Sequence, residues 1–122
     1  MDRKKALVVD DMEINRNVIK SFLYFEKFDV DLAEDGIKGL DLLSKNKYDL
    51  VFSDIEMPNM NGMELLTRAK KNPTTKNIPI VMLTSLDKQE IIDKAKELGA
   101  SGYIVKPFTK EKMETLLKNI GF

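Results

Sequence analysis

Four short apolar runs and one short segment of alternating polar and apolar residues are interleaved with five longer segments along the 122-residue chain, and in these longer segments apolar residues recur every three or four positions. A short apolar run bounded by turn residues is typical of a buried strand, and the longer spacing is typical of a helix with one buried face. Strict alternation of strands and helices requires crossover connections, which place parallel strands in one sheet with helices on both faces. We therefore predict an α/β fold with a five-stranded parallel sheet.

The predicted elements are placed by residue range. Strands are expected at 6–9, 29–33, 49–53, 78–83 and 103–105, and helices at 13–27, 37–46, 62–72, 87–98 and 110–120. Helical spacing predicts that the first helix buries Ile14, Val18, Phe22 and Phe25. The second strand alternates polar and apolar residues, as a strand at a sheet edge does, and the strand order 2-1-3-4-5 places it at an edge.

Polar side chains stand where four of the predicted strands end. Asp10 and Asp11 follow the first strand, and Asp54 follows the third. Thr84 ends the fourth strand, and Lys106 follows the fifth. The order 2-1-3-4-5 places the third strand between the first and the fourth, and the carboxyl ends of parallel strands share the edge where ligands bind in open α/β sheets. We expect these side chains to surround Asp54.

Three neighbouring carboxylates repel one another, and a divalent cation removes that repulsion. Mg²⁺ prefers oxygen ligands, takes few of them from protein and keeps several water molecules. We predict a magnesium site whose ligands are Asp11, Asp54 and the backbone carbonyl of Glu56. Asp10 is expected to act on the ion through a water molecule.

With that charge neutralised, the Asp54 carboxylate is predicted to attack a phosphoryl group and to form an aspartyl phosphate. Lys106 is expected to neutralise the phosphoryl oxygens, which is the main catalytic task in phosphoryl transfer. The Thr84 hydroxyl is expected to donate a hydrogen bond to another of these oxygens. The predicted catalytic residues are therefore Asp54, Lys106 and Thr84, and no organic cofactor is expected.

The composition removes other kinds of chemistry. The chain has neither Cys nor His, which excludes thiol catalysis, a disulfide framework and a histidine base. Lys and Arg number 20 and Asp and Glu number 20, whereas a nucleic-acid partner would require a basic stripe. No apolar stretch reaches the length of a membrane span or a signal-peptide core, so we expect a cytoplasmic protein with no membrane contact.

Four motifs together resemble the receiver domain of bacterial two-component response regulators, in particular the single-domain regulators of the chemotaxis type. The motifs are Val8-Val9-Asp10-Asp11, Asp54-Ile55-Glu56-Met57-Pro58-Asn59-Met60-Asn61-Gly62, Leu83-Thr84-Ser85 and Lys106-Pro107-Phe108. They occur in order and at the family's spacing, so residues 1–122 are expected to form one receiver domain. The resemblance implies the flavodoxin-like fold with the strand order 2-1-3-4-5.

The resemblance also implies a mechanism. Asp54 would be phosphorylated, with Mg²⁺, by a sensor histidine kinase or a phosphotransfer protein. The Thr84 hydroxyl would then move toward the phosphoryl group and Tyr103 would turn inward. The surface made by the fourth helix, the fifth strand and the fifth helix would thereby change its affinity for a downstream effector protein. Such a domain catalyses only its own phosphorylation and dephosphorylation, and we expect a monomer, with dimerisation on activation as an alternative.

The chain departs from the family pattern near the phosphorylation site. Ser85 stands where the family more often has Ala, and Glu56 and Leu86 occupy positions that tune the dephosphorylation rate. Two alternatives stay open at this point. One is a receiver domain cut from a hybrid kinase or a longer regulator. The other is a phosphatase with Asp54 as nucleophile, although Glu56 stands where such phosphatases have a second Asp.

Overall fold

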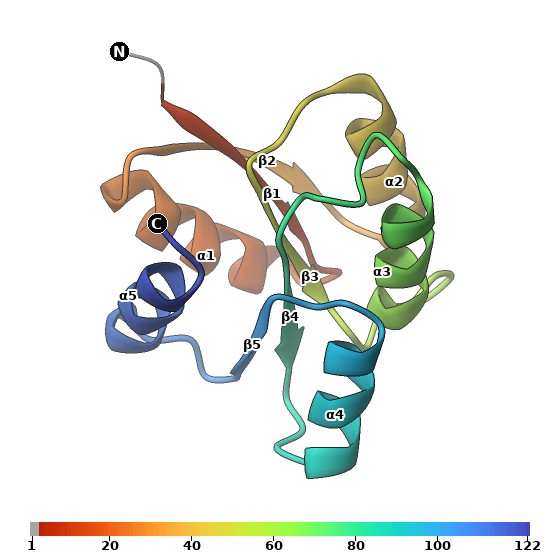
Figure 1. Cartoon of the computed structure of the whole chain (residues 1–122). Helices are drawn as coiled ribbons and strands as arrows, with labels where there is room; N and C mark the ends of the chain where they lie inside the picture. The colour runs from red at the N-terminus through yellow and green to blue at the C-terminus, as the bar shows by residue number, and fades with distance from the viewer. Residues whose placement is uncertain (1–2) are drawn as a thin grey trace.

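The computed structural model of the protein describes residues 3–122. A five-stranded parallel sheet lies in the middle of the molecule, between two layers of helices (Figure 1). The strands are β1 (Lys4–Val9), β2 (Phe28–Ala33), β3 (Leu50–Asp54), β4 (Ile80–Thr84) and β5 (Gly102–Val105). The helices are α1 (Glu13–Phe25), α2 (Gly36–Lys45), α3 (Gly62–Lys71), α4 (Gln89–Glu97) and α5 (Lys110–Asn119). The strand order β2-β1-β3-β4-β5 confirms the predicted order and fold class.

The two faces of the sheet carry separate apolar layers. Helices α1 and α5 cover one face, and α2, α3 and α4 cover the other (Figure 1). Neighbouring residues of β3 point alternately into the two layers, so Phe52 packs with α1 and α5 while Val51 packs with α2, α3 and α4. None of the helices in the described part of the chain is long and apolar enough to cross a membrane.

Helix α1 buries a different face from the predicted one. Ile19 and Leu23 are fully buried against the sheet and α5, whereas Ile14 is 65% exposed and Phe25 is 81% exposed. Phe22 packs at the border of the core. Apolar residues stand on both sides of this helix, so their spacing alone predicted the wrong face. The docking of α1 onto β1 and α5 decides which side is buried.

The two edges of the sheet are protected in different ways. On β2, Asp29 pairs with Arg3 at 2.9 Å, and Asp31 pairs with Lys5 at 3.3 Å. These partly exposed carboxylates confirm the predicted edge position of the alternating strand. The other edge strand, β5, has only four residues, and the Lys112 amine donates to the backbone carbonyl of Val105 at 2.8 Å.

The loop between β3 and α3 folds back tightly against the end of β3. The Gly62 N–H donates to the Ile55 carbonyl at 2.9 Å, and a Cβ at position 62 would collide with the carbonyl oxygen of Asp54. The Asn61 side chain caps α3 by accepting a hydrogen bond from the Glu64 N–H at 3.0 Å. Glycine at position 62 therefore allows α3 to begin directly beside Asp54.

Candidate functional site

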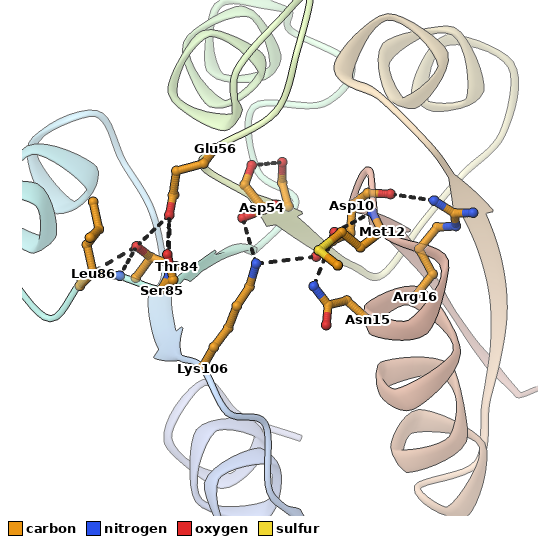
Figure 2. Close-up of polar contacts among 11 residues, drawn as sticks. Asp10, Met12, Asn15, Arg16, Asp54, Glu56, Thr84, Ser85, Leu86 and Lys106 are labelled. Atoms are coloured by element: carbon orange, nitrogen blue, oxygen red, sulfur yellow. Dashed lines mark hydrogen bonds and ion pairs between the residues drawn. The ribbon is translucent and has the colours of Figure 1, made fainter.

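The carboxyl ends of β1, β3, β4 and β5 bring polar side chains from distant parts of the chain to one edge of the sheet (Figure 2). Carboxylate oxygens of Asp10, Asp11 and Asp54 lie within 4.8 Å of one another. Lys106 extends from the end of β5 into the space between Asp54 and Asp10 (Figure 2). Thr84 lies on the other side of Asp54, at the end of β4.

Asp54 is the last residue of the central strand β3 and is 1% exposed. Burial raises the pKa of its carboxyl group to about 7, and the nearby Asp10 carboxylate raises it as well. Lys106 acts in the opposite direction and lowers the pKa, since its ammonium lies 3.4 Å from Asp54 Oδ1. The site therefore holds a carboxylate that is poorly hydrated and that depends on nearby positive charge for its ionised form.

Asp10 is fully buried, and its two carboxylate oxygens have different surroundings. Oδ1 accepts hydrogen bonds from the Met12 N–H at 2.9 Å and from the Asn15 side chain at 3.5 Å. Within residues 3–122, Oδ2 is a buried side-chain oxygen without a hydrogen-bond donor, and the Lys106 ammonium lies 4.0 Å from it. Burial raises the pKa of this carboxyl group too. A buried anionic oxygen with no donor is one that a bound cation would satisfy.

The donor set at this edge fits a hard divalent cation. Asp10, Asp11 and Asp54 offer only carboxylate oxygens, and the exposed Asp11 leaves the cluster open to solvent on one side. Mg²⁺ combines one or two carboxylates with water, so such a set suits it. The Glu56 carboxylate does not belong to this cluster of three acids, and the backbone carbonyl of Glu56 stays a predicted ligand.

Lys106 is held by its backbone as well as by its side-chain contacts. Its N–H donates to the Thr84 carbonyl at 2.8 Å, which continues the pairing of β5 with β4 beyond the strand end. The peptide bond between Lys106 and Pro107 is cis. The Lys106 ammonium group lies among the carboxylates, and its side chain is 22% exposed.

The two predicted switch residues, Thr84 and Tyr103, lie on β4 and β5. Thr84 is 1% exposed, and its hydroxyl oxygen accepts the Leu86 N–H at 3.0 Å. Tyr103 stands on β5 and is 37% exposed, and the Lys96 ammonium lies 6.0 Å from the centre of its ring. The structure brings Thr84 to the site, whereas Tyr103 lies on the surface of the edge strand.

Three residues, Asn15, Arg16 and Glu56, make side-chain contacts at the site that were not predicted from the sequence. Asn15 contacts the Asp10 carboxylate, and the Arg16 guanidinium donates to the Asp10 backbone carbonyl at 2.8 Å. The Glu56 carboxylate faces Thr84, the last residue of β4, and Ser85, which follows it. Asn15 and Arg16 lie in the first turn of α1, four and five residues after Asp11, and this nearness in sequence was the one signal that could have predicted their contacts.

Comparisons with known proteins agree with this fold and identify the family of the chain. The sequence model of the response regulator receiver domain family matches residues 6–118, so the chain belongs to this family. It is 36% identical to the chemotaxis protein CheY-3 of Vibrio cholerae over 121 residues, which cover 95% of this chain and 93% of that protein. It is 35% identical to the chemotaxis protein CheY of Pseudomonas aeruginosa over 122 residues, covering 96% and 98% of the two chains.

Solved structures show the same architecture. The structure of the chemotaxis response regulator CheY4 of Vibrio cholerae superposes with a TM-score of 0.91 at 32% identity, covering 98% of this chain and 99% of that one. The chain is thus a receiver domain of the kind found in chemotaxis response regulators, a class of signalling domain. These relatives do not favour the phosphatase alternative.

Proposed function

We propose that Asp54 accepts a phosphoryl group from a sensor histidine kinase or a phosphotransfer protein, and that the aspartyl phosphate changes the affinity of the domain for a downstream effector protein. The observation that carries this proposal is the buried Asp54 carboxylate at the end of the central strand, with the Lys106 ammonium 3.4 Å away. Membership of the receiver family supports the same assignment. The whole of residues 1–122 would act as one domain in the cytoplasm, and as a monomer before phosphorylation.

In the transfer step, an Asp54 carboxylate oxygen forms a bond to phosphorus. The bond between phosphorus and the donor's leaving atom breaks, and its electron pair departs with the donor group. Lys106 balances negative charge on the transferred oxygens. Since burial raises the Asp54 pKa to about 7, nearby positive charge also keeps more of this nucleophile ionised.

Asp10, Asp11 and Asp54 would hold Mg²⁺, together with the backbone carbonyl of Glu56. When bound, the ion supplies positive charge against the phosphoryl oxygens and the carboxylates. Oδ2 of Asp10 has no hydrogen-bond donor among the residues that the structure describes, and this supports the assignment because a buried carboxylate oxygen without a partner is costly. Asn15 and Arg16 orient Asp10 in this arrangement by fixing its side chain and its backbone.

The readout would lie on the strands beyond Asp54. The Thr84 hydroxyl would donate to the phosphoryl group, and Tyr103 would leave its exposed position and turn inward. Such a change alters the surface of α4, β5 and α5, which would bind the effector protein. We propose that the domain does not turn over a separate substrate, because its product stays bound to its own side chain until hydrolysis.

The test is the intact mass of the protein after incubation with acetyl phosphate, with Mg²⁺ and with a chelator. We expect one added phosphoryl group per chain, dependent on Mg²⁺ and absent in Asp54→Asn. Steady release of phosphate from small esters without labelled protein would point to a phosphatase and contradict the proposal. Labelling of Asp54→Asn to the same extent would contradict the assignment of the residue.

A further inference from the structure

Glu56 stands two residues after Asp54, in the loop between β3 and α3, and its side chain turns toward β4 (Figure 2). One carboxylate oxygen, Oε1, faces three donors. The Ser85 hydroxyl lies 3.0 Å from it, the Ser85 N–H nitrogen 3.3 Å and the Thr84 hydroxyl 3.4 Å. The donors at the end of β4 therefore converge on a single anionic oxygen.

The Thr84 hydroxyl carries one proton, so it donates to one acceptor at a time. Its oxygen accepts a hydrogen bond from the Leu86 N–H, and this bond ties the Thr84 hydroxyl to the loop that follows β4. Two acceptors then lie within its reach, the Glu56 carboxylate and the Leu86 carbonyl, each at 3.4 Å. A charged acceptor makes the stronger hydrogen bond, which favours Glu56.

These donors lie on the side of Asp54 opposite to Asp10, because β3 lies between β1 and β4. On the Asp10 side, Lys106 already contacts both Asp54 and Asp10. On the β4 side, a phosphoryl group on Asp54 would require the Thr84 hydroxyl and the Ser85 backbone N–H, and Ser85→Ala keeps both of these donors. In the unphosphorylated chain those donors face a carboxylate of the chain itself.

We infer that the Glu56 carboxylate is an internal competitor of the phosphoryl group: it engages the donors of Thr84 and Ser85 and must release them when Asp54 is phosphorylated. The inference rests on the proposed function. Ser85 is a positioning residue in this arrangement, because its hydroxyl makes the shortest of the three contacts and acts through Glu56. The competitor slows phosphorylation and favours the unphosphorylated arrangement of the loop after β4.

The experiment measures the initial rate of labelling by acetyl phosphate in Mg²⁺, by intact mass, on the full chain. Glu56→Ala removes the competitor and leaves the backbone carbonyl, so labelling should become faster by on the order of fivefold, the worth of one net hydrogen bond. Glu56→Gln keeps an uncharged acceptor, and its rate should lie between those of the wild type and Glu56→Ala. Glu97→Ala is the matched control, since Glu97 is an exposed acid at the far end of α4 and its loss changes the net charge equally.

Ser85 is tested in a double-mutant cycle with Glu56. Ser85→Ala should accelerate labelling by itself, and should add nothing in the Glu56→Ala background. The backbone amide signal of Ser85 in a ¹⁵N–¹H spectrum should move upfield in Glu56→Ala, because the N–H loses its anionic acceptor. A change in fold alone would not produce this pattern of rates.

The outcomes separate the inference from the proposed function. A rate for Glu56→Ala equal to that of Glu97→Ala overturns the inference while labelled wild-type protein upholds the proposed function. Equal rates for Glu56→Gln and Glu56→Ala also overturn it, because charge alone would then explain the effect. Additive effects of Ser85→Ala and Glu56→Ala overturn the role of Ser85. No labelling of any variant, wild type included, contradicts the proposed function and with it the inference.

Discussion

Asp54→Asn should stabilise the metal-free protein at neutral and alkaline pH. The carboxyl group of Asp54 has a pKa of about 7 in the folded chain, raised from 3.8 chiefly by burial. The folded protein therefore binds this proton more tightly than the unfolded chain does. The resulting stability is complete below pH 4 and is lost as the pH rises through about 7. Asparagine has a similar shape and carries no charge, so the variant should not suffer this loss.

The magnitude follows from the two pKa values. The difference between 3.8 and about 7 corresponds to about 4 kcal/mol in the free energy of unfolding at pH 8. The amide group introduced by Asp54→Asn must find hydrogen-bond partners, so we expect a net gain of about 2 to 4 kcal/mol at pH 8. At pH 4.5 Asp54 is protonated in the folded protein but mostly ionised in the unfolded chain, so the two pKa values leave an effect of only about 1 kcal/mol before the cost of the amide.

The assay is urea unfolding followed by circular dichroism in a chelating buffer, at pH 4.5 and pH 8. With a slope of about 1 to 3 kcal/mol per molar urea, the expected gain moves the midpoint at pH 8 by about 1 M or more. Asp93→Asn is the control, since Asp93 is an exposed acid on α4 and should change stability by less than about 0.5 kcal/mol. A variant that is less stable than the wild type at pH 8, or equally more stable at both pH values, would refute the reasoning.

Three further predictions concern the fold and the site. Leu23→Ala should lower the free energy of unfolding by about 2 to 5 kcal/mol, whereas Phe25→Ala, at an exposed position, should lower it by less than about 1 kcal/mol. Equal losses in urea unfolding would contradict the observed buried face of α1. Lys106→Ala should reduce the rate of labelling by acetyl phosphate about a hundredfold while Mg²⁺ still raises the melting temperature; an unchanged rate would exclude Lys106 as the charge partner. Replacing both Asp29 and Asp31 with Val should make concentrated solutions scatter light over hours, and clear solutions would show that the charges on β2 are not needed against association.

The strand order and the gathering of the polar residues could be predicted because both depend on simple patterns. Apolar runs that end in Asp10, Asp54, Thr84 and Lys106 define strand ends, and a parallel sheet places all strand ends on one edge. The roles assigned to these residues rest on chemistry and on the family resemblance, and they stay predictions until the labelling experiment is made.

Other features depend on packing that no local pattern encodes. Helix α1 carries apolar residues on two sides, and only its contacts with the sheet and α5 select Ile19 and Leu23 for the core. The contact between Glu56 and Ser85 joins residues 29 positions apart and depends on the direction of one exposed side chain. Periodicity predicts which face of a strand is buried, but it does not predict such a side-chain direction.

The two edges of the sheet affect whether copies of the molecule can pair with one another in a concentrated solution. An open sheet exposes unpaired backbone groups along each outer strand, and a second copy could add its own strand there. Bringing two β2 edges together would place Asp29 and Asp31 of one molecule against the same acids of the other. At the opposite edge, β5 offers only four residues, and Lys112 already engages one of its carbonyl groups. Edge-to-edge pairing with a second copy is therefore disfavoured on both sides of the sheet.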